Sequence, residues 1–293
     1  MRNAFIDELI SSARLNEKIV LIVGDLGYGV VEPFAIEFPK RFINAGVAEQ
    51  SMMSVAAGMA SEGYHPFVYS IANFPTFRCA EQIRNDVAYH NLPVTVVAVG
   101  GGLSYGNLGY SHHAVQDYAL IRSMPGMLIA APGDPFEVRA CMRYLAQNPQ
   151  PSYLRLGKTG EPILHSSIPE VGPGQWVQVR KGLADTRAYL TTGGVLDMVC
   201  KESVAHASIY SLPLWGMATK GVQAEFVSKF ESVVTVEDHL LDGGMGSWML
   251  ESLTTKSELL SRVRHVFLSS DVCGMVGRQS TLNAAGGLSG ANL

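Results

Sequence analysis

Short apolar runs alternate with longer amphipathic segments through the first half of the chain. The runs are apolar at consecutive positions, which predicts strands of a parallel sheet buried on both faces. In the segment at 50–62, Met52, Val55, Ala56 and Met59 recur at helical spacing and predict one buried stripe. This alternation predicts an α/β fold. The expected strands are 19–23, 66–71, 94–99, 127–131 and 151–156, and the expected helices lie near 2–15, 50–62, 76–91, 115–124 and 134–148.

A segment rich in glycine and proline, at 157–174, interrupts the pattern and predicts a linker. The alternation then resumes, so the sequence predicts two α/β domains with parallel sheets, at residues 1–165 and 166–293. The glycine-rich tail from Gly286 is expected to be mobile. In the second domain the expected strands are 187–192, 207–212, 233–237 and 265–269, and the expected helices lie near 195–204, 221–230, 245–255 and 277–285.

Charge and composition argue against several classes of protein. A net charge of −4 and a pI near 6.1 provide no electrostatic footprint for nucleic acid or an anionic membrane. No apolar stretch approaches the ~18 residues that span a bilayer, and the first residues lack the apolar core of a signal peptide. The cysteines have neither zinc-site nor disulfide spacing, which favours a reducing cytoplasm. They are Cys79, Cys141, Cys200 and Cys273.

Two glycine-rich loops follow expected strands, at 24–29 and 100–103. Both miss the GxGxxG spacing of a dinucleotide site, and neither leads into a good helix start that would hold a pyrophosphate. The sequence therefore argues against a nicotinamide cofactor.

Glu49 stands at the start of the apolar helix expected at 50–62. Such a residue is commonly a first-turn glutamate stabilised by the helix dipole. Val47, Ala48, Met52 and Met53 surround it in sequence, however, and an apolar environment would favour its protonated form. Glu49 is therefore a candidate for proton transfer.

His112 and His113 end a long loop after the strand expected at 94–99. Open α/β sheets bind ligands at the carboxyl ends of their strands, where this loop begins. No carboxylate or third histidine stands at metal-ligand spacing, so substrate contact is the better functional interpretation than a metal site. An ordinary surface histidine is the alternative for each.

Four segments resemble, in the same order, motifs of the transketolase family, which includes deoxyxylulose phosphate synthases and 2-oxo acid dehydrogenase beta subunits. Each motif is weak alone, but together they cover the chain from Arg2 to about Gly277. The segments are Gly-Val-Ala-Glu-Gln at 46–50, Gly-Tyr-Ser-His at 109–112, Ser-Tyr-Leu-Arg-Leu at 152–156 and Val-Thr-Val-Glu-Asp-His at 234–239, the last followed by Gly-Gly-Met-Gly-Ser at 243–247.

The resemblance implies a pyrimidine-binding domain for thiamine diphosphate followed by a transketolase C-terminal-like domain. Glu49 would hydrogen-bond the aminopyrimidine and promote the tautomer that activates the cofactor, which itself carries the carbanion chemistry. A raised pKa of this carboxyl would suit that proton relay. Phe74 or Phe77 would stack on the pyrimidine, and the local register leaves both open, while Asp25 would lie near the ring.

The resemblance also implies contacts with the substrate. His112 would orient or protonate substrate oxygens, with His113 as a further contact. Arg155 would bind an anionic group through its forked donors, and Arg2 matches a second phosphate-binding arginine of the family.

Departures from the family pattern imply a partner chain. The family binds the diphosphate and its divalent metal through a Gly-Asp-Gly…Asn motif in a separate domain, and the nearest strings here, at 133–134 and 242–244, lack that form. A second, N-terminal subunit would then hold the diphosphate with Mg²⁺ or Ca²⁺, in an assembly expected to contain two copies of each chain. No metal ligand is assigned to the present chain.

Two further departures concern the substrate, expected to be a sugar or sugar phosphate. Where transketolase carries an aspartate and a second histidine, this chain has Leu108 and Gly100. A leucine cannot accept a hydrogen bond from a sugar hydroxyl, so the sequence predicts a preference for a deoxy, branched or otherwise modified sugar, or a small acyloin.

The sequence therefore predicts a two-subunit transketolase-type transferase that moves a two-carbon ketol unit from a ketose donor to an aldehyde acceptor. Two alternatives remain open. One is the beta subunit of a 2-oxo acid dehydrogenase, and the other is a non-catalytic scaffolding subunit that kept the fold.

Overall fold

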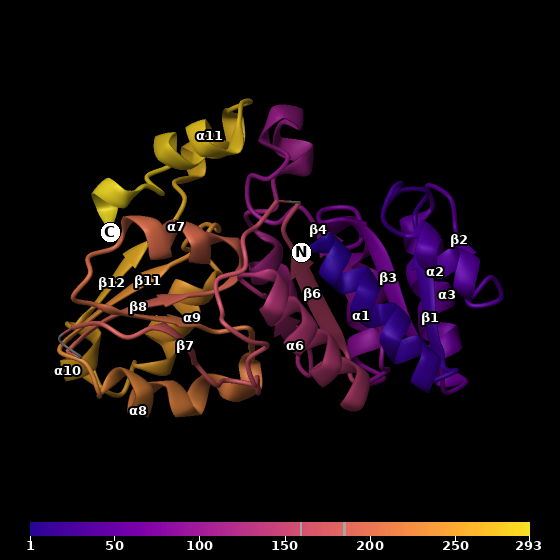
Figure 1. The fold of residues 1–293 in the computed structure, drawn as a ribbon, viewed down its shortest axis with the longest axis horizontal. Helices are drawn as coiled ribbons and strands as arrows, with labels where there is room; N and C mark the ends of the chain where they lie inside the picture. Colours follow the sequence, from indigo (N-terminus) through magenta and orange to yellow (C-terminus); the bar gives the residue numbers. More distant parts are fainter. Residues whose placement is uncertain (159, 184–185) are drawn as a thin grey trace.

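Two β-sheets flanked by helices make up the chain in the computed structural model, which describes residues 1–158, 160–183 and 186–293 (Figure 1). This confirms the expected α/β class. In the described part of the chain, no helix is long and apolar enough to cross a bilayer.

The first sheet has seven strands in the order β10-β5-β6-β4-β3-β1-β2. All its neighbours are parallel except β10, which runs antiparallel to β5 at one edge. β10 comes from the second half of the chain and was not expected, so the exact boundary after residue 165 stays a prediction. The strands are β1 (Ile19–Val23), β2 (Phe42–Asn44), β3 (His65–Ile71), β4 (Thr95–Val99), β5 (Leu128–Ala130), β6 (Ser152–Leu156) and β10 (Leu214–Gly216).

Helices cover both faces of this sheet. α1 and α6 pack together over one face, and α3 packs over the other (Figure 1). The single helix expected at 76–91 is instead divided into η1 (Phe77–Cys79), α4 and a π-helical turn, η2 (Ile83–Ala88). The α-helices are α1 (Arg2–Leu15), α2 (Glu32–Glu37), α3 (Glu49–Ser61), α4 (Ala80–Gln82), α5 (Asp117–Arg122) and α6 (Pro135–Gln147).

The buried stripe of α3 differs from the expected one. Met52 and Ala56 are buried as predicted, but Val55 is 48% exposed and Met59 is half-buried. Met53 and Ala57 are buried instead, because α3 faces β1 and β3 one position further round than the spacing suggested.

The second sheet has five strands in the order β12-β11-β8-β9-β7, parallel except for the edge pair β7–β9. The described part of the expected linker contains no helix or strand. The strands are β7 (Val177–Arg180), β8 (Arg187–Thr191), β9 (Ser208–Ser211), β11 (Ser232–Val236) and β12 (Val263–Val266), and the α-helices are α7 (Leu196–Glu202), α8 (Gln223–Val227), α9 (Met245–Ser252), α10 (Ser257–Leu260) and α11 (Gln279–Ala285).

The expectation of a mobile tail from Gly286 is wrong. Leu288 is only 2% exposed and belongs to the core of the second sheet. Arg264 Nη1 donates to the carbonyl oxygen of Asn292 at 2.6 Å, which holds the last turn, η8 (Gly290–Asn292), against β12. Glycines that fit close turns, rather than a lack of contacts, account for the composition of this tail.

Candidate active site

Glu49 is the first residue of α3 and its side chain is only 3% exposed. Glu49 lies next to the carboxyl end of β1. A Cβ atom on Gly24, the residue after that strand, would stand 3.8 Å from Glu49 Cγ. Arg78 Nη1 donates to Glu49 Oε2 at 2.9 Å. A buried carboxylate with a single nearby cation is placed to exchange hydrogen bonds with a ligand that enters from the side of Arg78.

The loop after β3 carries both candidate aromatic residues. Phe74 is half-buried, and the Arg78 guanidinium lies over its ring at 4.6 Å from the centroid. Phe77 is 46% exposed. The structure thus brings Phe74, and not Phe77, into contact with the side chain that pairs with Glu49.

His112 lies on the short helix η4 (Tyr110–His112), with its ring edge-on to Phe74 at 5.3 Å between centroids. Its Nδ1 is 2.9 Å from Ser111 Oγ. Asn73 Nδ2 donates to the carbonyl oxygens of Ser111 and His113, which fastens this loop to the one that carries Phe74. Burial lowers the pKa of His112, with a smaller effect from its neighbour His113.

His113 does not share this position. Its side chain is 2% exposed and Nε2 points to the carbonyl oxygen of Gly106 within the same loop, at 3.5 Å. A substrate outside the loop cannot reach this imidazole, so the geometry argues against the expected contact and favours a role in loop structure.

Asp25 lies at the rim of the site, in the left-handed region at φ 54. Its Oδ1 accepts from Tyr28 Oη at 3.1 Å and from Asn44 Nδ2 at 3.0 Å. Asn44 Oδ1 in turn accepts the backbone N–H groups of Asp25 and Gly46. This pairing ties the end of β1 to the turn that precedes Glu49.

Three consecutive glycines after β4 make room for large side chains. A Cβ on Gly100 would collide with the ring of Tyr105, and Cβ atoms on Gly101 and Gly102 would collide with Arg155 and Asp238. The run that fails as a dinucleotide fingerprint is therefore a close-packing motif. Tyr105 occupies the space into which a side chain at position 100 would point.

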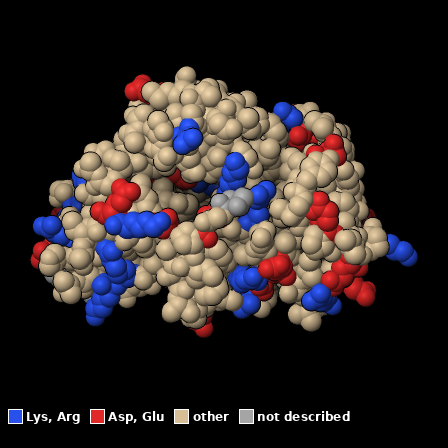
Figure 2. Space-filling view, turned by 45° about the horizontal axis from the view of Figure 1, so that its top comes forward, with Lys and Arg blue, Asp and Glu red and all other residues tan. Residues whose placement is uncertain are grey.

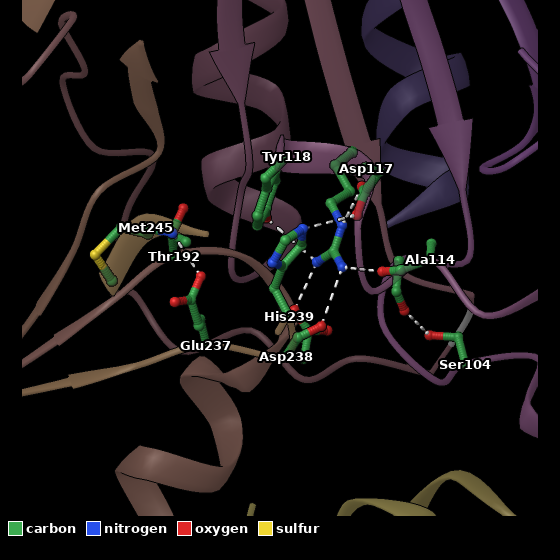
Figure 3. Close-up of polar contacts among 12 residues, drawn as sticks. Ser104, Ala114, Asp117, Tyr118, Thr192, Glu237, Asp238, His239 and Met245 are labelled. Carbon is green, nitrogen blue, oxygen red and sulfur yellow. Dashed lines mark hydrogen bonds and ion pairs between the residues drawn. The ribbon is translucent and has the colours of Figure 1, made fainter. Parts of the chain in front are cut away.

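Arg155 on β6 borders the cavity between the two domains, but its donors are already paired within the protein, which argues against the expected role in substrate binding. It is 3% exposed, and its five N–H groups all have acceptors. Figure 3 labels the residues that supply them, which are Ala114, Asp117, Tyr118 and Asp238. Nε donates to Asp117 Oδ2 at 2.8 Å, and Nη1 donates to Asp238 Oδ1 at 2.6 Å and to Tyr118 Oη at 3.2 Å. Nη2 donates to the carbonyl oxygens of Ala114 and Asp238. The guanidinium joins the two domains instead.

Lys158, which the sequence did not single out, is the better-placed cation. It follows β6, is exposed, and holds its ammonium 5.0 Å from the centre of the Tyr105 ring. Together with Ser104 it lines a cavity of about 300 Å³ between the two domains. Figure 2 shows a hollow in this face where basic and acidic atoms meet. The sequence offered one signal for Lys158: it lies three residues after Arg155, just beyond the end of β6.

Arg2 lies at the start of α1, half-buried beside Tyr69. Burial raises the pKa of Tyr69 to about 12, and the charge of Arg2 opposes that rise. Arg2 Nε is a buried donor without a partner among the described residues.

In the described part of the chain, no three His, Cys, Asp or Glu side chains gather as a metal site. Exposed apolar side chains surround Glu49 and the His112 loop instead. They are Tyr28, Val47, Phe77, Leu108 and Tyr110, between 46% and 77% exposed.

Comparisons with known proteins agree with this geometry. Residues 1–160 match the family described as "Transketolase, pyrimidine binding domain". The "Putative transketolase C-terminal section" of Methanocaldococcus jannaschii is 33% identical over 100% of this chain and 93% of that protein. One of the subunits of the apulose-4-phosphate transketolase from Phocaeicola vulgatus is 32% identical, over 86% of this chain and 83% of that protein.

A solved structure described as "Split gene transketolase, inactive beta4 tetramer" superposes with a TM-score of 0.84. It is 28% identical, and the match covers 99% of this chain and 94% of that one. The order of the strands, the helix that begins at Glu49 and the extent of the match lead to one conclusion: the chain belongs to the transketolase family, and residues 1–160 are its pyrimidine-binding domain.

Proposed function

We propose that this chain is the C-terminal subunit of a two-subunit, thiamine diphosphate-dependent transketolase. The enzyme would transfer a two-carbon ketol unit from a ketose phosphate donor to an aldehyde acceptor. One observation carries the proposal: a buried carboxylate, Glu49, and a half-buried aromatic ring, Phe74, both contact the guanidinium of Arg78 at the carboxyl edge of a parallel sheet.

The residues present fit an aminopyrimidine ring. A planar group that donates hydrogen bonds and stacks on an aromatic face needs an acceptor and a ring side by side. The Arg78 guanidinium, itself planar, makes both contacts here, one to Glu49 Oε2 and one to the Phe74 ring. We call the place defined by Glu49 and Phe74 the pyrimidine seat.

Each residue of the site has one task in this proposal. When bound, thiamine diphosphate supplies a carbon nucleophile and an electron sink. Glu49 holds the proton that is exchanged with the pyrimidine nitrogen, and Phe74 fixes the plane of the ring. Asp25, with Asn44, positions the turn before Glu49.

His112 faces the same space and would bind substrate oxygens in its neutral form, which its lowered pKa favours near neutral pH. Lys158 replaces Arg155 as the proposed ligand of the anionic end of the substrate, because its ammonium is exposed and Arg155 is fully paired. Arg2 remains a second candidate.

In this proposal the site forms half of a cofactor pocket, and the other half comes from a partner. Among the described residues no cluster of His, Cys, Asp or Glu side chains offers a metal site. We propose that an N-terminal subunit supplies both, with its divalent metal, and covers the exposed apolar side chains around Glu49. The description of the similar beta4 tetramer as inactive is in keeping with this dependence.

The substitution Glu49→Gln tests the proposal in the complex with the partner. It keeps the size of the side chain but removes the titratable proton, so we expect kcat to fall by about 10²–10⁴-fold. Circular dichroism and co-purification with the partner should be unchanged. If the variant complex keeps more than half of the turnover, Glu49 is a structural helix-terminal acid and the proposed role is wrong.

A further inference from the structure

Arg78 imitates the ligand that the pyrimidine seat is expected to hold. Its guanidinium donates to Glu49 Oε2 at 2.9 Å and lies over the Phe74 ring, with its central carbon 4.6 Å from the ring centroid. Those are the two contacts that an aminopyrimidine would need. The guanidinium of Arg78 and the aminopyrimidine ring therefore cannot occupy the seat together. Resting on the proposed function, we propose that Arg78 is a displaceable occupant of the pyrimidine seat, which competes with the cofactor.

The surroundings of Glu49 leave the seat one open side. The carboxylate is 3% exposed, and Gly24 and Cys79 lie behind it, where the charge of Glu49 helps burial to raise the pKa of Cys79 to about 12. His112 meets Phe74 at the edge of the ring, not over its face. A ligand must therefore approach Glu49 and the face of Phe74 from the side that Arg78 covers.

Arg78 is also built to move. Its backbone is anchored, because it lies in η1 next to Cys79, which is fully buried and donates from Sγ to the carbonyl oxygen of Phe74. Its side chain is 46% exposed, so the head lies at the mouth of the seat. A change of rotamer would release the guanidinium to solvent without moving the backbone.

The exchange has a definite consequence for cofactor affinity. When a side chain of the protein occupies the site, the apparent dissociation constant of the ligand rises. It equals the intrinsic constant divided by the fraction of molecules in which the site is free. A cation over an aromatic ring and a half-exposed ion pair each contribute modestly. We expect removal of Arg78 to tighten cofactor binding by about tenfold.

The deciding experiment compares thiamine diphosphate binding by calorimetry in the complex with the partner. The substitution Arg78→Met keeps the length and apolar stem of the side chain but removes the guanidinium. We expect its dissociation constant to be about tenfold lower than that of the wild type. The matched control is Arg14→Met, which breaks an exposed Arg–Glu pair with Glu37 away from the site and should change nothing.

A second measurement uses the full chain without its partner and only the pyrimidine fragment, 4-amino-5-hydroxymethyl-2-methylpyrimidine. Titration by NMR should give tighter binding for Arg78→Met than for the wild type, and Glu49→Gln in that background should remove the gain. This readout does not depend on turnover.

The outcomes separate the two proposals. A wild-type complex that binds thiamine diphosphate upholds the cofactor, whatever Arg78 does. If Arg78→Met then binds it equally or more weakly, the occupant role is overturned, and weaker binding would make Arg78 a ligand of the cofactor. If no complex binds thiamine diphosphate, the proposed function fails, and this inference fails with it.

Discussion

Arg155 Nη1 and Asp238 Oδ1, which lie 2.6 Å apart, connect the two sheets of this chain through a buried ion pair. Arg155 is on β6 of the first sheet, and Asp238 follows β11 of the second. Asp117, at the start of α5, holds the other side of the same guanidinium at 2.8 Å. A single guanidinium therefore lies between two buried carboxylates, one from each half of the chain.

Replacement of Arg155 should therefore affect stability before it affects catalysis. In Arg155→Met both Asp117 and Asp238 lose the buried cation that pairs with them, and Asp117 keeps only the hydrogen bond from Tyr153 Oη at 2.6 Å. We expect a loss of about 3–5 kcal/mol in the free energy of unfolding, because an uncompensated buried charge is costly. Urea unfolding followed by circular dichroism measures this. A loss below about 1 kcal/mol would mean that water screens the two carboxylates.

Lys158 should behave in the opposite way. Its ammonium is exposed and contacts only the Tyr105 ring among the described residues, so Lys158→Met should leave the unfolding curve unchanged. We expect KM for a phosphorylated substrate to rise about tenfold, equivalent to ~1.4 kcal/mol, with a smaller change for its unphosphorylated analogue. Equal effects on both substrates would show that Lys158 does not bind the phosphate.

Phe74 and Phe77 can be separated by cofactor affinity. The Phe74 ring lies under the Arg78 guanidinium, which contacts Glu49, whereas Phe77 is 46% exposed at the rim of the site. In the complex, Phe74→Ala should weaken thiamine diphosphate binding by about tenfold, since ring stacking contributes about 1 kcal/mol beyond area burial. Phe77→Ala should instead weaken association with the partner. Calorimetry measures both, and a reversed ranking would assign the stacking to Phe77.

Much of the fold could be predicted because both faces of the strands are buried. β1 was predicted at its observed bounds and β3, β4 and β6 within a residue, since most positions in these runs are apolar. β10 was missed because Leu214–Gly216 is only three residues long and joins the sheet of the other domain. Pairing between distant segments leaves no periodic signal in a short strand.

The site was predicted less completely, for a related reason. Glu49 and His112 come from motifs; the structure places His112 edge-on to Phe74 and connects Glu49 to the same ring through Arg78. The assignment of Arg155 did not anticipate its burial, because a motif does not tell whether a charged side chain on a strand has partners such as Asp238 on a distant segment. Arg78 was passed over since its role depends on a contact across 29 residues of sequence.

His65 should make the chain less stable in acid. Burial lowers its pKa from 6.5 to about 4, and the groups against its ring are Thr95 Oγ1 and the Phe67 ring, neither of them charged. The unfolded chain then takes up the proton first, so the stability is complete above pH 6.5 and is lost as the pH falls towards 4. At pH 5 the loss from this residue is about 2 kcal/mol.

The control for that pH dependence is His65→Gln, which cannot titrate in this range. Urea unfolding at pH 7 and at pH 5 should give a smaller decrease in the free energy of unfolding for the variant than for the wild type. Equal decreases would place the acid sensitivity in other groups, of which His239 is the next candidate because burial lowers its pKa to about 4 as well.

The preference for the substrate should depend on Leu108 far more than on Gly100, although both depart from the family pattern. Leu108 is 50% exposed on the short helix η3 (Gly106–Leu108), so an aspartate there meets no steric conflict. Gly100 has φ +87, and a Cβ on it would collide with the Tyr105 ring. A histidine at position 100 would therefore require Tyr105 to leave its place, which predicts a loss of stability and not a new specificity.

We accordingly expect Leu108→Asp to shift the preference of the complex towards xylulose 5-phosphate. The new carboxylate would accept a hydrogen bond from a sugar hydroxyl that leucine leaves unsatisfied, at a cost of ~1–3 kcal/mol. Each 1.4 kcal/mol recovered raises kcat/KM about tenfold relative to a deoxy or branched analogue. Leu108→Asn serves as the control, since it can accept the same hydrogen bond without the charge and should recover part of the gain. If the wild-type complex already uses xylulose 5-phosphate efficiently and Leu108→Asp adds nothing, the hydroxyl is bound elsewhere. Tyr105, which lies beside His112, and Ser104, which lines the interdomain cavity, would then be the next residues to replace.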